Sequence, residues 1–183
     1  MSFTKNILLL LASPADGWNS VKKYNVPAQV MLSKVYFPLL AVLAVTAFAA
    51  MFYKSDVGIA YCIQKAIIEF AKFFLGYHLS SYILTGFFPN IAHDTDSANK
   101  VNIAILYNMA ILVIINIIEN LLPAPWLFLK IFYVYIFFVS SKCTDFLGIE
   151  QNNFFKYLIP GFAIVFQFFI GHILNISLSL TSA

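Results

Sequence analysis

Five apolar runs of helical length, separated by short polar stretches, dominate the sequence. Three of these runs are residues 35–53, residues 101–122 and residues 157 to about 178. Each predicts a transmembrane helix, because about 20 apolar residues that rise 1.5 Å each cross the roughly 30 Å hydrocarbon core of a bilayer. The run of residues 126–141 is shorter and follows a tight turn at 123–125. We expect it to form the fourth span.

One apolar stretch, residues 57–88, is too long for a single span and carries Lys65, Glu69 and Lys72. We divide it into a polar lead-in, residues 57–71, and a second span that starts near Lys72. Five spans then follow one another along the chain. The sequence therefore predicts an all-α, polytopic membrane helix bundle of about five transmembrane helices.

The first 34 residues predict an N-terminal helical segment that lies along the membrane surface. Residues 3–12 predict a short interfacial helix, since their continuous apolar run, residues 7–12, is shorter than the ~7–15 residues of a signal-peptide core. Ser13, Pro14 and Asp16 then have the order expected at a helix start. We expect this helix to cover residues 14–24, to break at residues 25–27, and to be followed by a new helix that enters the bilayer and is kinked at Pro38.

Aromatic residues and lysines in this segment suit the level of the lipid headgroups. We expect Trp18, Lys22, Lys23 and Tyr24 to act as membrane-interface anchors. The chain thus divides into an N-terminal interfacial segment, residues 1–34, and a transmembrane domain, residues 35–183.

The positions of the lysines predict the orientation of the chain. All 11 basic residues are lysines. With a cytoplasmic N-terminus, the inner side collects Lys5, Lys22, Lys23, Lys34, Lys100, Lys142 and Lys156. The outer side collects Lys54, Lys65, Lys72 and Lys130. This bias predicts a cytoplasmic N-terminus and a C-terminus on the outer side.

Composition supports a membrane protein and excludes several classes of function. The chain is 61% hydrophobic and 10% charged, whereas a soluble domain carries about 25% charged residues. The absence of arginine argues against phosphate recognition and nucleic-acid recognition as the main function. Cys62 and Cys143 lie far apart in the sequence, so we expect free buried thiols.

Charged and amide side chains within the spans are the candidate functional residues, because a charge at membrane depth costs roughly 2.5–3.5 kcal/mol. Helical periodicity places one polar stripe on each of two spans. The stripe of the second span holds Lys65, Glu69, Lys72, Gly76 and Ser80. That of the third span holds Asn102, Asn108, Asn116, Glu119 and Asn120.

Two interpretations of these stripes remain open. In the first, hydrogen bonds and ion pairs fix the packing of the helices. In the second, a polar path carries an ion or a small solute, with Glu69, Glu119 and His78 or His172 handling protons. Under both we expect the Glu119 carboxylate within ~4 Å of a lysine of the second helix, with Lys130 in reserve.

The sequence gives little support for metal or cofactor chemistry. His93 lies beside Asp94 and Asp96, which we interpret as a solvated acidic loop. No nucleophile elbow, zinc-protease motif or glycine-rich phosphate loop occurs. We therefore expect no enzymatic activity, no cofactor and no metal.

Three features resemble the Yip family, five-span membrane proteins named for interaction with Ypt/Rab GTPases. Residues 11–18, Leu-Ala-Ser-Pro-Ala-Asp-Gly-Trp, are similar to the family's segment ahead of the first span. Residues 76–83, Gly-Tyr-His-Leu-Ser-Ser-Tyr-Ile, are similar to its Gly-Tyr-Ser-Leu run. The number and spacing of the spans are the third feature. With 34 residues before the first span, the likeness is to the short bacterial form, which implies an inner-membrane protein.

Two functions follow as hypotheses. The first is a non-enzymatic, Yip-like scaffold or interaction partner for membrane proteins or lipids, with the bilayer, other membrane proteins or a second copy of the chain as partners. The alternative is a small transporter or channel subunit. It would use a polar network of Lys65, Glu69, Lys72, His78, Asn116, Glu119 and Lys130.

Overall fold

A computed structural model describes residues 3–24, 26–53, 57–88, 94–123, 127–151 and 153–181. Helices and short connections account for all of these residues, and none of them lies in a strand. The predicted all-α class is therefore confirmed for the described part of the chain.

The N-terminal segment is a hairpin of two helices whose bounds are those predicted. Helix α1 covers Phe3–Ala12 and α2 covers Pro14–Tyr24. The Ser13 hydroxyl donates a hydrogen bond of 2.7 Å to Asp16 in the first turn of α2. The two helices approach closely at Gly17, where a Cβ atom would lie 2.7 Å from the backbone nitrogen of Leu10. Glycine therefore permits the contact between α1 and α2.

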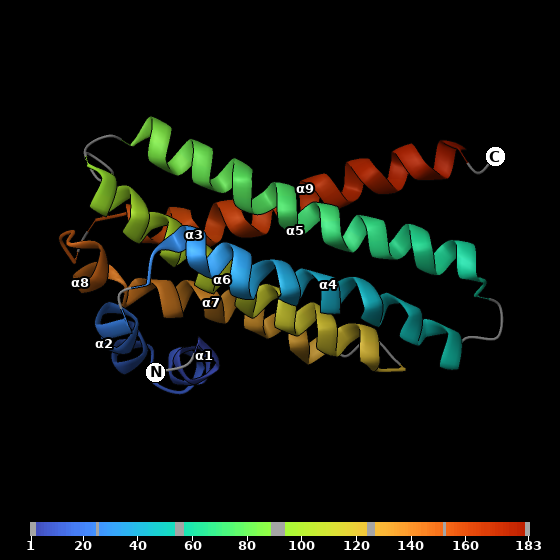
Figure 1. Ribbon diagram of the computed structural model, residues 1–183, viewed down its shortest axis with the longest axis horizontal. Helices are drawn as coiled ribbons and strands as arrows, with labels where there is room; N and C mark the ends of the chain where they lie inside the picture. Colours follow the sequence, from blue (N-terminus) through green and yellow to red (C-terminus); the bar gives the residue numbers. More distant parts are fainter. Residues whose placement is uncertain are drawn as a thin grey trace.

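Five helical segments run in alternating directions along the long axis of the molecule (Figure 1). The first is continuous through α3 (Ala28–Met31), η1 (Leu32–Tyr36), α4 (Phe37–Thr46) and η2 (Ala47–Phe52). The others are α5 (Ile59–Phe87), α6 (Thr95–Leu121), η3 (Leu127–Lys130) with α7 (Ile131–Ser141), and α9 (Phe155–Thr181). The short α8 (Thr144–Leu147) and the hairpin lie at one end, and the C-terminus lies at the other (Figure 1).

Three of the five segments are long and apolar enough to cross a membrane. They are Ala28–Phe52, Thr95–Leu121 and Phe155–Leu178. Helix α5 has sufficient length, with 29 residues, but carries Lys65, Glu69 and Lys72. Helix α7 is apolar but has only 11 residues. Five spans therefore remain a prediction, of which three meet the requirements of length and composition.

Two local details differ from the expectation. Helix α5 runs without a break from Ile59, so nothing separates the predicted lead-in from the predicted span. Lysine and glutamate are good helix formers, which explains the continuity. Near Pro38 the first segment forms a π-turn, in which the N–H of Phe37 bonds to the carbonyl of Leu32. Proline lacks an N–H group, and the wider turn before it accommodates this loss.

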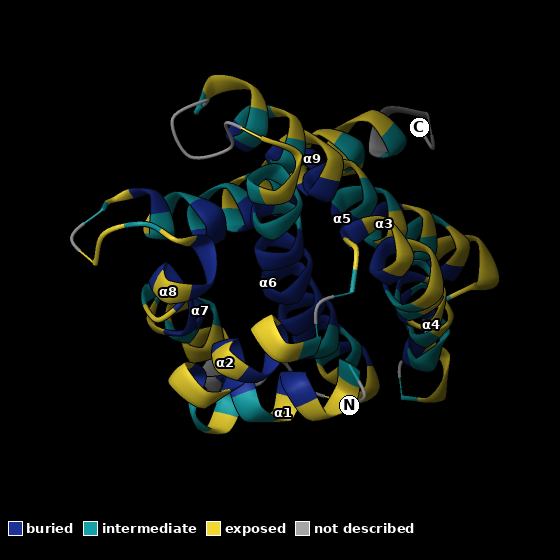
Figure 2. Ribbon diagram, turned by 60° about the vertical axis from the view of Figure 1, so that its left-hand side comes forward, coloured by how far each residue is buried: buried dark blue, intermediate teal, exposed yellow. Residues whose placement is uncertain are grey.

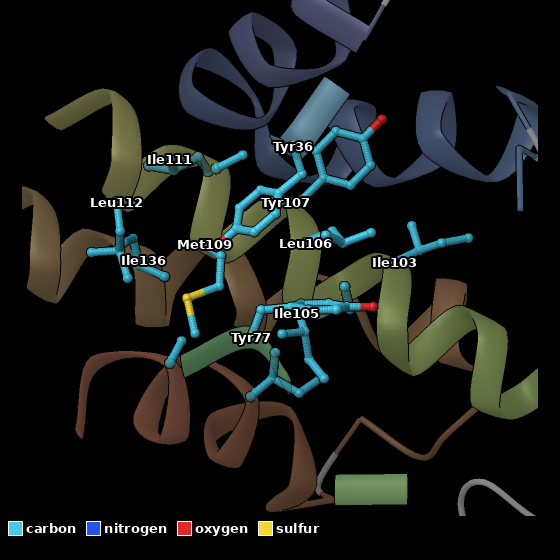
Figure 3. Packing of buried hydrophobic residues seen from close by; sticks show 14 of the residues in the cluster. Tyr36, Tyr77, Ile103, Ile105, Leu106, Tyr107, Met109, Ile111, Leu112 and Ile136 are labelled. Carbon is cyan, nitrogen blue, oxygen red and sulfur yellow. The ribbon is translucent and has the colours of Figure 1, made fainter. Parts of the chain in front are cut away.

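Helix α6 lies at the centre of the bundle and is buried on all sides over most of its length (Figure 2). Its apolar residues Ile105, Leu106 and Met109 pack with Tyr36 and Tyr77 of the neighbouring helices (Figure 3). A helix that is hydrophobic all round is expected at such a position.

The surrounding helices expose large apolar side chains outward. Phe52 is 91% exposed, and Val45, Tyr82, Val134 and Phe169 are also exposed. Exposed apolar groups on several sides of a bundle are typical of a surface that faces lipid.

Trp18 is enclosed by protein. Its side chain is 2% exposed, and its Nε1 donates a 2.8 Å hydrogen bond to the carbonyl of Val139. Its ring stacks on Phe146 at a centroid distance of 5.3 Å and meets Tyr107 edge-on. Trp18 therefore anchors the hairpin to the bundle, because a buried indole needs an acceptor and α7 supplies one.

The other three predicted interface anchors differ from Trp18. Lys22 and Lys23 are exposed, and Tyr24 is partly exposed. Their predicted contact with lipid headgroups stays a prediction.

The contact at Gly17 generates the first prediction. Gly17→Ala should lower the midpoint of thermal unfolding in detergent and make the bond between α1 and α2 more sensitive to protease, because the new Cβ meets the backbone of Leu10. Gly86→Ala is the matched control, since a Cβ at that position meets no atom within 4 Å. Equal behaviour of the two variants would contradict a close contact between α1 and α2.

Candidate functional site

A polar cavity of about 480 Å³ lies between α5, α6, α7 and α9. It uses the first half of α5 and the later parts of α6 and α9, so it belongs to the half of the bundle nearer the C-terminus (Figure 1). Its lining is Ile68, Glu69, Lys72, Asn116, Glu119, Lys130, Tyr133, Gln167, Phe168, Gly171, His172 and Asn175. Five of the seven residues predicted for the polar network are in this set.

Lys72 joins two helices at this cavity. Its Nζ lies 2.8 Å from Oε2 of Glu69, one turn earlier on α5, and donates a hydrogen bond of 3.1 Å to Oδ1 of Asn116 on α6. The Lys72 and Glu69 side chains are only 12% and 13% exposed. Lys72 is the fourteenth residue of α5, which puts it about 20 Å from the start of the helix. The ion pair therefore lies deep in the bundle.

Tyr133 extends this hydrogen-bonded chain to α7 and α9. Its hydroxyl oxygen accepts from Nδ2 of Asn116 at 2.9 Å and from Nε2 of Gln167 at 3.2 Å. Because that oxygen accepts twice, the hydroxyl proton is available to an acceptor in the cavity. Oε1 of Gln167 is buried and has no hydrogen-bond partner among the described residues. The cavity thus offers both a donor and an acceptor to a bound molecule.

Glu119 lines the cavity, but the ion pair predicted for it with a lysine of the second helix or with Lys130 is not among those between described residues. The ion pairs between described residues are Lys72–Glu69 and Lys100–Asp96, and Glu119 takes part in neither. Since α5 is one continuous helix, Glu69 lies one turn from Lys72 and reaches its ammonium group first. Glu119 is left facing the cavity, where Lys130 also lies.

A second hollow of about 620 Å³ continues this space along α5 and α9. It shares Ile68, Glu69, His172 and Asn175 with the first cavity. Its lining is completed by Tyr61, Gln64, Lys65 and Ile176. Because Tyr61 is near the start of α5 and Ile176 near the end of α9, the polar space extends toward the C-terminal end of the bundle.

His78 does not belong to this cluster. It is exposed on the outside of α5, where its ring contacts Phe74 at 4.7 Å and Tyr77 at 5.1 Å between centroids. Nine residues separate His78 from Glu69, which places the two about 180° apart around the helix. Helical periodicity, applied to this pair, could have excluded His78 from the predicted network.

The polar network predicted from the sequence did not include several other residues that line the cavity. Gln167, Gly171, His172 and Asn175 share one face of α9, a polar pattern that is visible in the sequence. Tyr133 gives no such signal, because it stands in an aromatic run within the apolar α7.

Three further asparagines of the predicted α6 stripe bind neighbouring helices. Oδ1 of Asn102 accepts a hydrogen bond from Ser81, and Oδ1 of Asn108 accepts one from Ser140. Asn120 donates to Oγ1 of Thr46. These contacts confirm the interhelical role for the three asparagines.

Beyond Lys72, the middle of α5 packs against α6 through apolar side chains. Phe73 and Leu84 of α5 pack with Tyr107 and Met109 of α6, and all four are fully buried. The polar cavity therefore ends against a packed apolar layer.

Metal sites find no support in the described residues. No group of three histidine, cysteine, aspartate or glutamate side chains gathers there. Asp94 caps α6 by accepting from the N–H of Ser97, and Asp96 pairs with Lys100. His93 lies outside the described residues.

The two cysteines are free and buried, as expected. Burial raises the pKa of the Cys143 thiol to about 12, so this thiol stays uncharged at neutral pH.

The ion pair at the cavity generates the second prediction. Lys72→Met should destabilise the protein in detergent by about 1–3 kcal/mol, because a largely buried Glu69 carboxylate loses its partner. The double variant Glu69→Gln, Lys72→Met should recover much of this loss. Chemical unfolding measures both, with Lys100→Met as the control, because that exposed pair is worth under about 1 kcal/mol. Equal losses for Lys72→Met and Lys100→Met would refute the assignment.

Comparisons with known proteins do not assign the chain to a family. Models of protein families, curated proteins and solved structures were all compared with it, and none matches significantly. The resemblance to the Yip family therefore stays a prediction from the residues that carry it.

Proposed function

We propose that the chain is a multi-pass membrane protein whose polar cavity binds a small polar or charged solute. The cavity itself carries this proposal. Glu119, Lys130, Gln167 and His172 line one space inside a bundle whose outer surface is apolar. Small-molecule sites have volumes of roughly 300–1,000 Å³ and a few converging polar groups, and this cavity has both properties.

A purely structural role accounts for only part of the polar residues. Asn102, Asn108 and Asn120 each bind a neighbouring helix, as such a role requires. Glu119 lines the cavity near the end of α6, is only partly exposed, and takes part in neither of the ion pairs between described residues. Its carboxylate is therefore available to a bound molecule.

The chemistry of the lining indicates the class of solute. The cavity offers a carboxylate at Glu119, an ammonium at Lys130 and an unpartnered amide oxygen at Gln167. These groups suit a small solute that both donates and accepts hydrogen bonds. We place entry at the C-terminal end of the bundle, because the polar space continues in that direction along α5 and α9, whereas Phe73 and Met109 close it on the other side. Passage across the membrane would require that packed apolar layer to rearrange.

The second candidate is a non-enzymatic scaffold of the Yip type in the inner membrane. Residues 11–18, which resemble the segment ahead of the first span in the Yip family, favour this candidate. They form part of the α1–α2 hairpin and hold it against the bundle. Exposed apolar faces of α5 and α9 would then contact lipid, other membrane proteins or a second copy of the chain.

Substitution of Glu119 distinguishes the two candidates and is the third prediction. The full chain in detergent is screened by thermal unfolding against a panel of amino acids, organic acids, amines and inorganic ions. We expect at least one compound to raise the unfolding midpoint, as ligands do when they bind only the folded state. Glu119→Gln should abolish this rise and leave the ligand-free midpoint nearly unchanged. Glu150→Gln, at an exposed position away from the cavity, should keep the rise.

A scaffold would give the opposite result. No member of the panel would stabilise the protein, or the stabilisation would survive in Glu119→Gln. Either outcome would reject a solute site at this cavity.

Orientation in the membrane is the fourth prediction. With five spans and a cytoplasmic N-terminus, a reporter fused after the last residue should be active only outside the cytoplasm. A reporter inserted within residues 90–100 should be active inside. A cytoplasmic reporter at the C-terminus would mean an even number of spans and would remove the membrane topology on which the proposal rests.

A further inference from the structure

A separate polar cleft of about 380 Å³ lies at the end of the bundle that carries the N-terminal hairpin. Helix α2, the end of α7, α8 and the start of α9 enclose it. Its lining is Ala15, Trp18, Asn19, Ser141, Lys142, Thr144, Asp145, Phe146, Gln151, Lys156 and Tyr157. It shares no residue with the cavity described above.

Two lysines from different elements face this cleft. Lys142 follows α7, and Lys156 is the second residue of α9. Nζ of Lys156 donates to the carbonyl of Gln151, which leaves two further N–H groups on that ammonium. Both ammonium groups also lie over aromatic rings, Lys142 over Phe138 and Lys156 over Tyr157. These contacts hold the two cations in place.

The remaining lining favours an anion over a cation. The N-terminus of the 27-residue α9 adjoins the cleft and adds a partial positive charge. Thr144 and Asn19 supply a hydroxyl and an amide group, whereas the Ser141 hydroxyl already donates to the carbonyl of Phe138. Asp145 is the only carboxylate in the lining, so the lysines and the helix end outweigh it.

We propose that this cleft binds a phosphate group, held between Lys142 and Lys156. A phosphate accepts several hydrogen bonds at once, which two ammonium groups and neighbouring hydroxyls can donate. The cleft is large enough to hold the organic group attached to the phosphate. It also lies at the end of the bundle that the lysine bias places on the cytoplasmic side, where anionic lipids are abundant. The phosphate can belong to a lipid headgroup or to a soluble compound.

Trp18 provides the readout for the test, because it lines the cleft and the chain has only two tryptophans. In the full chain with Trp126→Phe, Trp18 emission is followed during two titrations in detergent. One titration uses dioleoyl phosphatidylglycerol, and the other uses inorganic phosphate at constant ionic strength. Binding of the lipid alone assigns a headgroup site, and binding of phosphate assigns a site open to soluble compounds. Both outcomes support the cleft.

Three substitutions in the cleft and one control, all made in the Trp126→Phe background, separate a built site from general charge attraction. Lys142→Gln and Lys156→Gln should each weaken binding roughly tenfold, the size of one lost charge-assisted hydrogen bond. Asp145→Asn should strengthen binding, since it removes a like charge from the cleft. Lys22→Gln is the control, because this exposed lysine lies on α2 outside the lining and should leave affinity unchanged.

The proposal is overturned by any of three results. The first is that neither titrant changes Trp18 emission. The second is that Lys22→Gln weakens binding as much as Lys142→Gln and Lys156→Gln do. The third is an Asp145→Asn variant that binds no more tightly than the parent, which would mean that the bound group does not sit near that carboxylate.

Discussion

Every polar side chain that α6 carries into the centre of the bundle must find its partner within the protein. Helix α6 is enclosed by its neighbours, and an unpaired amide in such a place costs free energy. The asparagines therefore determine where the other helices lie. Asn102 bonds to Ser81 of α5, Asn108 to Ser140 of α7, and Asn120 to Thr46 of α4. Apolar packing alone would tolerate small rotations of these helices, whereas the hydrogen bonds specify one arrangement.

The polar cavity differs from the rest of the bundle, because some of its polar groups have no partner within the described protein. Lys72 and Tyr133 each contact two partners at this point, but Oε1 of the buried Gln167 has none among the described residues. Glu119 lines the same space and takes part in neither ion pair between described residues. A bundle that satisfies its asparagines so fully would not leave these two groups without use, since apolar residues could replace them at lower cost.

Local sequence signals predicted the parts of the structure that local forces determine. The Ser13–Pro14 start and the apolar run before it gave the bounds of α1 and α2, because caps and proline act within one turn. The apolar runs gave α6 and α9. The same signals did not locate the buried contacts of Trp18 or the role of Tyr133, because both depend on which helices become neighbours. Composition suggested a lipid-facing tryptophan, and only the packing of α7 shows that its partner is a carbonyl group.

The docked hairpin has a consequence for the order of assembly during synthesis. Asn6 on α1 bonds to Tyr107, which follows it by 101 residues, and Trp18 bonds to the carbonyl of Val139, 121 residues later. Helices α1 and α2 therefore leave the ribosome well before the helices that hold them in place. Until α7 has been made, Trp18 and the buried face of α1 must be sheltered by lipid or by the insertion machinery. Completion of α7 is thus the earliest point at which the N-terminus can close onto the bundle.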